Sequence, residues 1–392
     1  MRKIGTVSRG IRLPVVTEGD DLVRVVTESV VEAAASPYEP FAIRDGDVVG
    51  ITESLLARAQ GNYVTTEDIA ADVRKKFPEG DVAVLFPIMS RNRFYPLLRG
   101  IVAGTAGKVH VVFSYPTDEV GNQLIEPKNY YERMATLPEP SFDEERFYGH
   151  FGEHRHRFTG VDYVKLYKSI DPDKVVPHFS NDPHYALSLA RNVIVASIHA
   201  RDLHKQILAE SGARVAGLDD ICAAPAGGGT GFNAEYGLLG SNYTSEDKIK
   251  LFPRDAEAFV RQVQRALGER TGKRLEVLVY GDGAFKDPVC GIWELADPVV
   301  SPGFTDGLVG TPKEIKFKYV VDSTQEADKT AAVVEAIRGK GTGELSEKAS
   351  LGTTPRQLAD LIGSLCDLTS GSGDKGTPVV YISGYFDSYI AE

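Results

Sequence analysis

The stretch VLVYGDG, Val277 to Gly283, is a run of apolar and aromatic residues that ends in an aspartate between two glycines. A short run rich in β-favouring residues predicts a buried strand, and the glycines predict a turn directly after it. Proteins of the α/β class often present a carboxylate in this way, at the end of a strand. The stretch therefore favours an α/β fold with Asp282 as the candidate functional carboxylate.

Outward from this stretch, strand and helix patterns alternate along the chain, which predicts a mixed α/β protein. Short apolar runs predict strands at 11–16, 48–52, 82–86, 109–113, 192–197, 277–280 and 379–383. Longer segments with helical spacing predict helices at 22–35, 95–103, 201–210, 254–271, 326–338 and 354–365.

The length of 392 residues exceeds what one ordinary core holds, and predicts more than one structural part. Residues 114–183 are rich in Pro, Asp, Glu, Tyr and His, with little clean periodicity, and we interpret them as an inserted lobe. The predicted parts are 1–113 and 184–325, which form one core, the lobe 114–183, and a segment of helices and a strand at 326–392.

The formal net charge of -11 argues against a protein that tracks a nucleic-acid backbone, because that task needs a basic face. The three cysteines are far apart, so neither a zinc ribbon nor a disulfide framework is indicated, and a reducing compartment fits. No run of about 18 apolar residues occurs. We expect a cytoplasmic protein that binds neither nucleic acid nor membrane.

Three stretches together resemble the coenzyme F-420:L-glutamate ligase family, also described as F-420-0:gamma-glutamyl ligases. They are EGDDLVRVV followed by IRDGDVVGITESLLARAQGNYV, then NAEYGLLGSNY, and then LFPRDAEAFVRQVQRALGERTGKRLEVLVYGDGAFKDP. Their order and spacing agree with the family over residues 10–65 and 230–300, about a third of the chain. The resemblance implies a ligase-like core interrupted by the lobe, and a homodimer.

The chain departs from the family pattern at several positions, which suggests a divergent branch. The family's metal-site aspartate falls on Leu239, and the lysine and second serine of another family motif fall on Ser54 and Ala57. The glutamate of that motif falls on Gln60, and an arginine that follows the family's last aspartate falls on Lys286. The family residues that match Ser241, Asn242 and Asp282 are retained.

The resemblance implies a metal- and GTP-dependent ligase that joins L-glutamate to a coenzyme F-420-like or other anionic acceptor. ATP is the alternative nucleotide. Such a ligase activates the acceptor carboxylate as an acyl phosphate, and hard oxygen ligands suit the Mg²⁺ or Mn²⁺ that the phosphoryl transfer needs. We predict that Asp282 holds the metal together with Glu53, Gln60 and Asp287, and that Lys286 faces phosphate.

A glycine-rich loop precedes the second family stretch and is a candidate nucleotide site. The backbone N–H groups of Gly228, Gly229 and Thr230 can bind phosphate, although the loop lacks the spacing of a P-loop and can equally be a connector. Ser241 and Asn242 either contact the nucleotide or cap the next segment. Asp282 and Asp287 can alternatively be turn residues, since aspartate is common beside glycine and proline.

Two other functions stay open at the level of sequence. The loss of the family's aspartate at Leu239 is compatible with a non-catalytic protein that binds ligand on the same scaffold. The lobe at 114–183 is compatible with an amino-acid ligase that uses a different acceptor.

Overall fold

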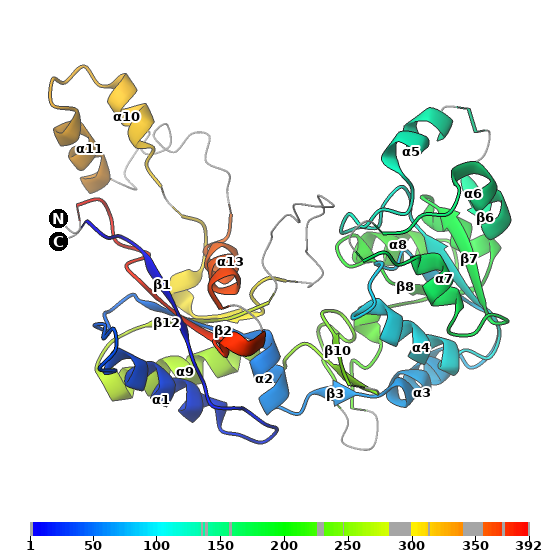
Figure 1. Cartoon of the computed structure of the whole chain (residues 1–392), viewed down its shortest axis with the longest axis horizontal. Coiled ribbons are helices and arrows are strands. Elements are labelled where there is room, and N and C mark those ends of the chain that lie inside the picture. The colour runs from blue at the N-terminus through cyan, green and yellow to red at the C-terminus, as the bar shows by residue number, and fades with distance from the viewer. Residues whose placement is uncertain are drawn as a thin grey trace.

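The computed structural model describes residues 3–134, 136–137, 140–156, 159–225, 231–245, 247–281, 299–312, 314–339, 356–370 and 373–390. In this part of the chain the strands form three sheets that contain both parallel and antiparallel pairs, which confirms the mixed α/β class. Two large sheets lie side by side, and a small three-stranded sheet joins them (Figure 1).

The first large sheet has five strands in the order β1-β14-β2-β12-β13. Its strands are β1 (Val7–Ile11), β2 (Val48–Thr52), β12 (Glu276–Tyr280), β13 (Gly303–Phe304) and β14 (Val379–Ser383). β2 and β12 run parallel, whereas the other neighbours are antiparallel. The inner strands β2, β12 and β14 are almost entirely buried because helices cover both faces of the sheet.

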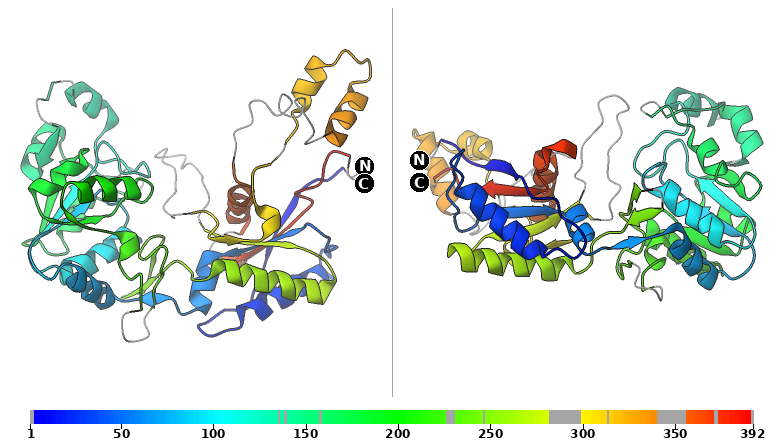
Figure 2. Two further views of the ribbon diagram at one scale, coloured as in Figure 1. Left: turned by 180° about the vertical axis from the view of Figure 1, so that it is seen from behind. Right: turned by 60° about the horizontal axis from the view of Figure 1, so that its bottom comes forward.

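Helices α1 (Leu22–Ala34) and α9 (Ala256–Thr271) cover one face of the five-stranded sheet, and α13 (Leu358–Ser370) covers the other (Figure 2). Gly50, in the middle of β2, leaves room for α13, because a Cβ added there would lie 2.4 Å from Cys366 Sγ. A larger residue at this position would push α13 away from the sheet.

The second large sheet has six strands in the order β6-β7-β5-β4-β8-β9. Its strands are β4 (Val82–Leu85), β5 (Val109–Phe113), β6 (Ser141–Asp143), β7 (Val175–Ser180), β8 (Asn192–Val195) and β9 (Arg214–Gly217). All neighbours are parallel except the edge strand β6. From the central β4 the chain winds outward through β5 and β7, then returns to β8 and winds outward on the other side. This is the order of a doubly wound sheet, with its switch point between β4 and β8.

Helices pack on both faces of the six-stranded sheet. One face carries α3 (Thr66–Lys76), α4 (Phe94–Gly104), α6 (Glu144–Phe151) and α7 (Tyr163–Lys168), and the other carries the 3-10 helix η1 (Pro183–Ser188) and α8 (Arg201–Glu210). Residues 114–183, which the sequence sets apart as a lobe, contribute β6 and β7 to this same sheet and also contain α5 (Pro127–Met134).

The small sheet contains β3 (Tyr63–Val64), β10 (Asn242–Ser245) and β11 (Lys248–Lys250), in the order β10-β11-β3. The chain leaves the five-stranded sheet through α2 (Glu53–Ala59) and β3, and returns to it through β10 and β11 (Figure 1). The remaining elements are η2 (Leu218–Asp220), η3 (Asp306–Leu308), α10 (Phe317–Ser323), α11 (Lys329–Arg338) and η4 (Gly373–Lys375). Within the described ranges, no helix has the length and apolar character needed to cross a membrane.

A histidine pair in the six-stranded sheet, in which His178 is buried, gives the fold a pH dependence. His178 Nε2 lies 3.0 Å from His110 Nδ1, and burial together with this neighbour lowers the pKa of His178 from 6.5 to about 4. Between these two values the unfolded chain binds a proton at this residue that the folded chain excludes. Stability contributed by neutral His178 is therefore present above pH 6.5 and is lost as the pH falls, by up to about 2 kcal/mol at pH 5.

Urea unfolding at pH 7 and pH 5 measures this loss, and the His178→Gln variant should lose less stability over the same interval. An equal loss in the variant and the wild type would show that other groups cause the pH dependence.

Candidate functional site

The parallel pair β2 and β12 brings two distant segments to one edge of the five-stranded sheet. Thr52 and Tyr280 are partners in the register, so Glu53 and Gly281, which follow them, leave the sheet at the same edge. The N–H of Gly281 donates to the carbonyl of Val300 at 2.7 Å. The chain therefore leaves β12 and returns to the sheet at this place, which is the carboxyl end of both parallel strands.

A buried ion pair lies at this edge. Glu53 opens α2 and Lys250 ends β11, and the Glu53 Oε2 atom is 2.6 Å from Lys250 Nζ. The two residues are only 5% and 3% exposed. A charge removed from water to this extent requires compensation, and each residue supplies the opposite charge to the other. The pair joins the five-stranded sheet to the small sheet.

Gln60 and Arg254 make a second connection at the far end of α2. The Gln60 side chain donates from Nε2 to the Arg254 carbonyl at 2.7 Å, and its Oε1 accepts from the Arg254 N–H at 2.9 Å. The side-chain amide of Gln60 thus makes both hydrogen bonds to the backbone of Arg254, one as donor and one as acceptor. This contact fixes the end of α2 against the segment that leads into α9.

Two buried asparagines hold the same junction. Asn62 Nδ2 donates to the Phe252 carbonyl at 2.8 Å, and its Oδ1 accepts from the Phe232 N–H at 3.0 Å. Asn233 Nδ2 donates to the carbonyls of Phe252 and Pro253 at 3.1 and 3.0 Å. Sequence reasoning missed both asparagines, and also Lys250 and Arg254, although all but Lys250 lie within the stretches that resemble the ligase family.

Ser241 and Asn242 are adjacent in sequence and serve different parts of the structure. Asn242 is the register partner of Lys250 in the β10–β11 hairpin, which places it beside the strand that carries the ion pair. Ser241 is 2% exposed and lines a small cavity with Leu239, and among the described residues its hydroxyl has no hydrogen-bond partner. Leu239, the position of the family's aspartate, is itself 1% exposed in an apolar core.

Six predicted site residues lie outside the described residues, namely Gly228, Gly229, Thr230, Asp282, Lys286 and Asp287. The described residues next to them are informative. The N–H of Gly231, which follows the glycine loop, donates to the Tyr63 carbonyl at 2.8 Å, directly beside Asn62. Gly281 precedes Asp282 at the edge shared with Glu53. Gly231 therefore contacts the small sheet at Tyr63, and Gly281 lies at the carboxyl edge of the five-stranded sheet.

The described ranges contain no group of three or more His, Cys, Asp or Glu side chains that could hold a metal ion. Glu53 supplies one carboxylate at the edge, and Lys250 neutralises its charge. These residues fit a divalent ion only in part, because Mg²⁺ and Mn²⁺ need several oxygen ligands. Asp282 directly follows Gly281, which lies at this edge, and is the candidate for a second carboxylate.

Residues 10–384 match the family model described as F420-0:Gamma-glutamyl ligase, which confirms the resemblance seen in the three stretches. No curated protein matches the chain.

Proposed function

Since the chain belongs to the F420-0:gamma-glutamyl ligase family, a family of enzymes, we propose that it joins L-glutamate to an anionic acceptor related to coenzyme F-420. GTP or ATP supplies the energy, and Mg²⁺ or Mn²⁺ accompanies the nucleotide. The observation that supports this most directly is the parallel pairing of β2 with β12. It brings Glu53 and the beginning of the Asp282 segment to one edge of the sheet.

The proposed reaction has two steps. A carboxylate oxygen of the acceptor attacks the γ-phosphorus, the bond to the β–γ bridging oxygen breaks, and the nucleoside diphosphate leaves. The amine nitrogen of glutamate then attacks the carbonyl carbon of the acyl phosphate. Inorganic phosphate leaves with the bonding electrons, and the amine proton passes to solvent or to a neighbouring base. Both steps depend on positioning and on neutralising phosphate charge.

The residues take the following parts in this proposal. Asp282 and Asp287 supply carboxylates to the metal, Glu53 lies at the same edge, and Lys286 faces the phosphates. A bound divalent ion would neutralise phosphate charge. Gln60 can reach an ion only with the lone pair that the Arg254 N–H leaves open on its Oε1 atom.

The proposed nucleotide contacts come from the segments that border the junction. The N–H groups of Gly228, Gly229 and Thr230 bind phosphate oxygens, since their loop ends at the Gly231–Tyr63 contact beside Asn62. Asn242 lies beside the strand of Lys250 and completes this side of the site. Ser241, which lines the small cavity, also contacts the nucleotide in this proposal.

Thermal unfolding with combinations of nucleotide and metal tests the proposal. We expect the melting temperature to rise by several degrees only when nucleotide and divalent ion are present together, because a ligand that binds the native state stabilises it. Incubation with L-glutamate and candidate acceptors should then give a product heavier than the acceptor by one glutamyl residue. The Asp322→Asn variant, altered at an exposed aspartate of α10, should behave like the wild type.

Leu239 supports one other candidate function, ligand binding without catalysis, because an apolar side chain buried in a core cannot hold a metal. Acceptor binding that does not need nucleotide, with no phosphate release and no product, would favour this function. A product formed only with another class of carboxylate acceptor would identify a ligase with a different substrate.

A further inference from the structure

The carboxyl edge of the six-stranded sheet has the topology of a ligand site. In doubly wound sheets, ligands bind outside the carboxyl ends of the strands, at the point where the winding reverses. Here that point lies between β4 and β8. The loop after β5 crosses it, because Asp118 Oδ2 accepts from the Met89 N–H after β4 and Glu119 contacts the segment after β8. One loop thus joins both sides of the crevice.

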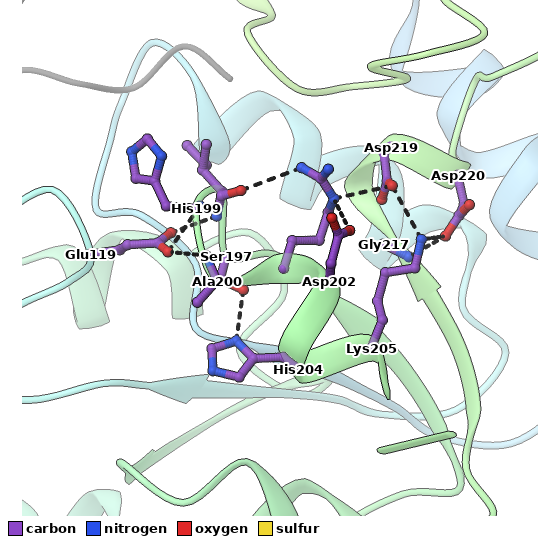
Figure 3. A network of polar contacts seen from close by, with 12 residues as sticks. Glu119, Ser197, His199, Ala200, Asp202, His204, Lys205, Gly217, Asp219 and Asp220 are labelled. Carbon is purple, nitrogen blue, oxygen red and sulfur yellow. Dashed lines mark hydrogen bonds and ion pairs between the residues drawn. The ribbon is translucent and has the colours of Figure 1, made fainter. Parts of the chain in front are cut away.

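The segment after β8 presents three successive backbone N–H groups to a carboxylate. Ile198 donates to Glu119 Oε2 at 2.5 Å, and His199 and Ala200 donate to Oε1 at 2.9 and 2.6 Å (Figure 3). These residues lead into α8, whose N-terminus adds a favourable field for an anion. The carboxylate occupies the position and supplies the charge that a phosphate group would have there.

An independent observation comes from the cavity behind this segment. Its volume is about 20 Å³, enough for one water-sized polar group, and Ile88, Ala196, Ile198 and Leu218 line it from the ends of β4, β8 and β9. Ser241 also lines it, 2% exposed and with its hydroxyl unpaired within the described ranges. A buried hydroxyl without a partner costs free energy, so this cavity suits a polar atom that the chain does not itself supply.

The side chains near the three N–H groups are already paired. Lys205 Nζ lies 3.1 Å from Asp219 and 2.6 Å from Asp220, and Arg201 Nε lies 3.1 Å from Asp219 (Figure 3). His204 Nδ1 is 2.9 Å from Ser197 Oγ, and burial lowers the pKa of this histidine. The attraction for an anion at this place therefore comes mainly from backbone N–H groups, which favours a small group with several acceptor oxygens over a long acidic surface.

We propose that this edge is a second ligand site, for a phosphate-bearing small molecule whose phosphate takes the N–H groups of Ile198, His199 and Ala200 in exchange for Glu119. Ser241 bonds a polar atom of the same ligand, or a water that the ligand retains. Glu119 swings toward solvent when the ligand binds and returns when it leaves. The phosphate contacts of this site are separate from the edge of β2 and β12, because the N–H groups of Ile198, His199 and Ala200 belong to the segment after β8. Ser241 is the one residue that it shares with the proposed nucleotide contacts.

Titration of the full chain with inorganic pyrophosphate, without divalent metal, tests this site. Glu119→Ala should bind pyrophosphate at least roughly tenfold more tightly than the wild type, because the internal competitor is gone. Glu145→Ala removes one negative charge at an exposed position of α6 and should leave the affinity unchanged. The backbone N–H resonance of His199 should shift in Glu119→Ala as pyrophosphate is added, and circular dichroism should show the variant to be folded.

The expected behaviour should persist in an Asp282→Asn background, which separates this site from the proposed catalytic one. The proposal is wrong if folded Glu119→Ala does not bind pyrophosphate, or if Glu145→Ala gains as much affinity as Glu119→Ala. It is also wrong if binding leaves the His199 resonance unmoved. Ser241→Ala provides a second test. Introduced into the Glu119→Ala variant, it should weaken the binding of pyrophosphate without altering the protein's fold.

Discussion

Replacement of Asp282 by asparagine is expected to lower the rate of amide formation at least about 100-fold. Asparagine keeps the size of the side chain and removes the charge that a divalent ion needs beside nucleotide phosphates. The largest change should be in kcat, because charge neutralisation matters most as the phosphoryl group is transferred. Product formation followed by mass spectrometry, at saturating nucleotide and metal, measures the effect.

The same variant should lose the joint stabilisation by nucleotide and metal and keep the melting temperature of the unliganded protein. Asp322→Asn is the matched control, with full rate and full ligand stabilisation. If Asp282→Asn bound metal and nucleotide as well as the wild type, Asp282 would have no part in the site. The turn interpretation, in which aspartate between two glycines only closes a turn, would then be correct.

Replacement of Lys250 by methionine is expected to destabilise the protein by about 3–5 kcal/mol. Methionine fills a similar volume but removes the ammonium group that lies 2.6 Å from the Glu53 carboxylate, which is 5% exposed. The dominant cost is that a buried carboxylate loses the opposite charge beside it, because a charge removed from water needs compensation. The expected readout is a lower urea midpoint at pH 7 with an unchanged slope.

The double variant Glu53→Gln with Lys250→Met separates these two causes. Because it removes both charges, it should recover a large part of the stability that the single change loses. A double variant no more stable than Lys250→Met would mean that packing, and not the loss of the opposite charge beside Glu53, accounts for the loss. The exposed substitution Lys329→Met on α11 is the control for a general change of charge.

Strands buried on both faces were the most predictable elements of this fold. The predicted strands at 48–52 and 379–383 coincide with β2 and β14. Each is a continuous apolar run between polar or glycine-containing turns, and such turns mark where a buried strand begins and ends. The first strand was misplaced. The run 11–16 contains Pro14, which lacks a backbone N–H, and the strand is β1 at Val7–Ile11 instead.

The pairing of strands could not be predicted from local patterns. β14 lies between β1 and β2, and residues from 114–183 complete the six-stranded sheet, although neither fact leaves a mark on the strands' own sequences. Composition separated 114–183 from its flanks because its loops are polar and irregular. Register and strand order depend on the path of the whole chain.

Sequence reasoning proposed carboxylates for the candidate site, and it missed the residues that support Glu53 and the end of α2. A charged residue next to glycine is a recognisable local pattern. Asn62 and Asn233 have no such pattern, because the backbone groups that they bond to are about 20 to 190 residues away. Lys250 is 197 residues from Glu53, in a short strand with nothing unusual in its sequence. Such partners become visible only when the chain is folded. The roles of Asp282, Lys286, Asp287, Gly228, Gly229 and Thr230 stay predictions.

The position of β14 in the middle of the five-stranded sheet has a consequence for the protein during its synthesis. β4 through β9 emerge from the ribosome in one continuous stretch, so the six-stranded sheet can fold while translation is still in progress. β1 and β2 emerge earlier but are separated by β14, which is the last of the strands that the structure describes. β1 and β2 therefore lack their shared partner β14 at a stage when the six-stranded sheet can already be folded. Chaperones that protect exposed strand edges should bind this N-terminal segment until Val379–Ser383 inserts.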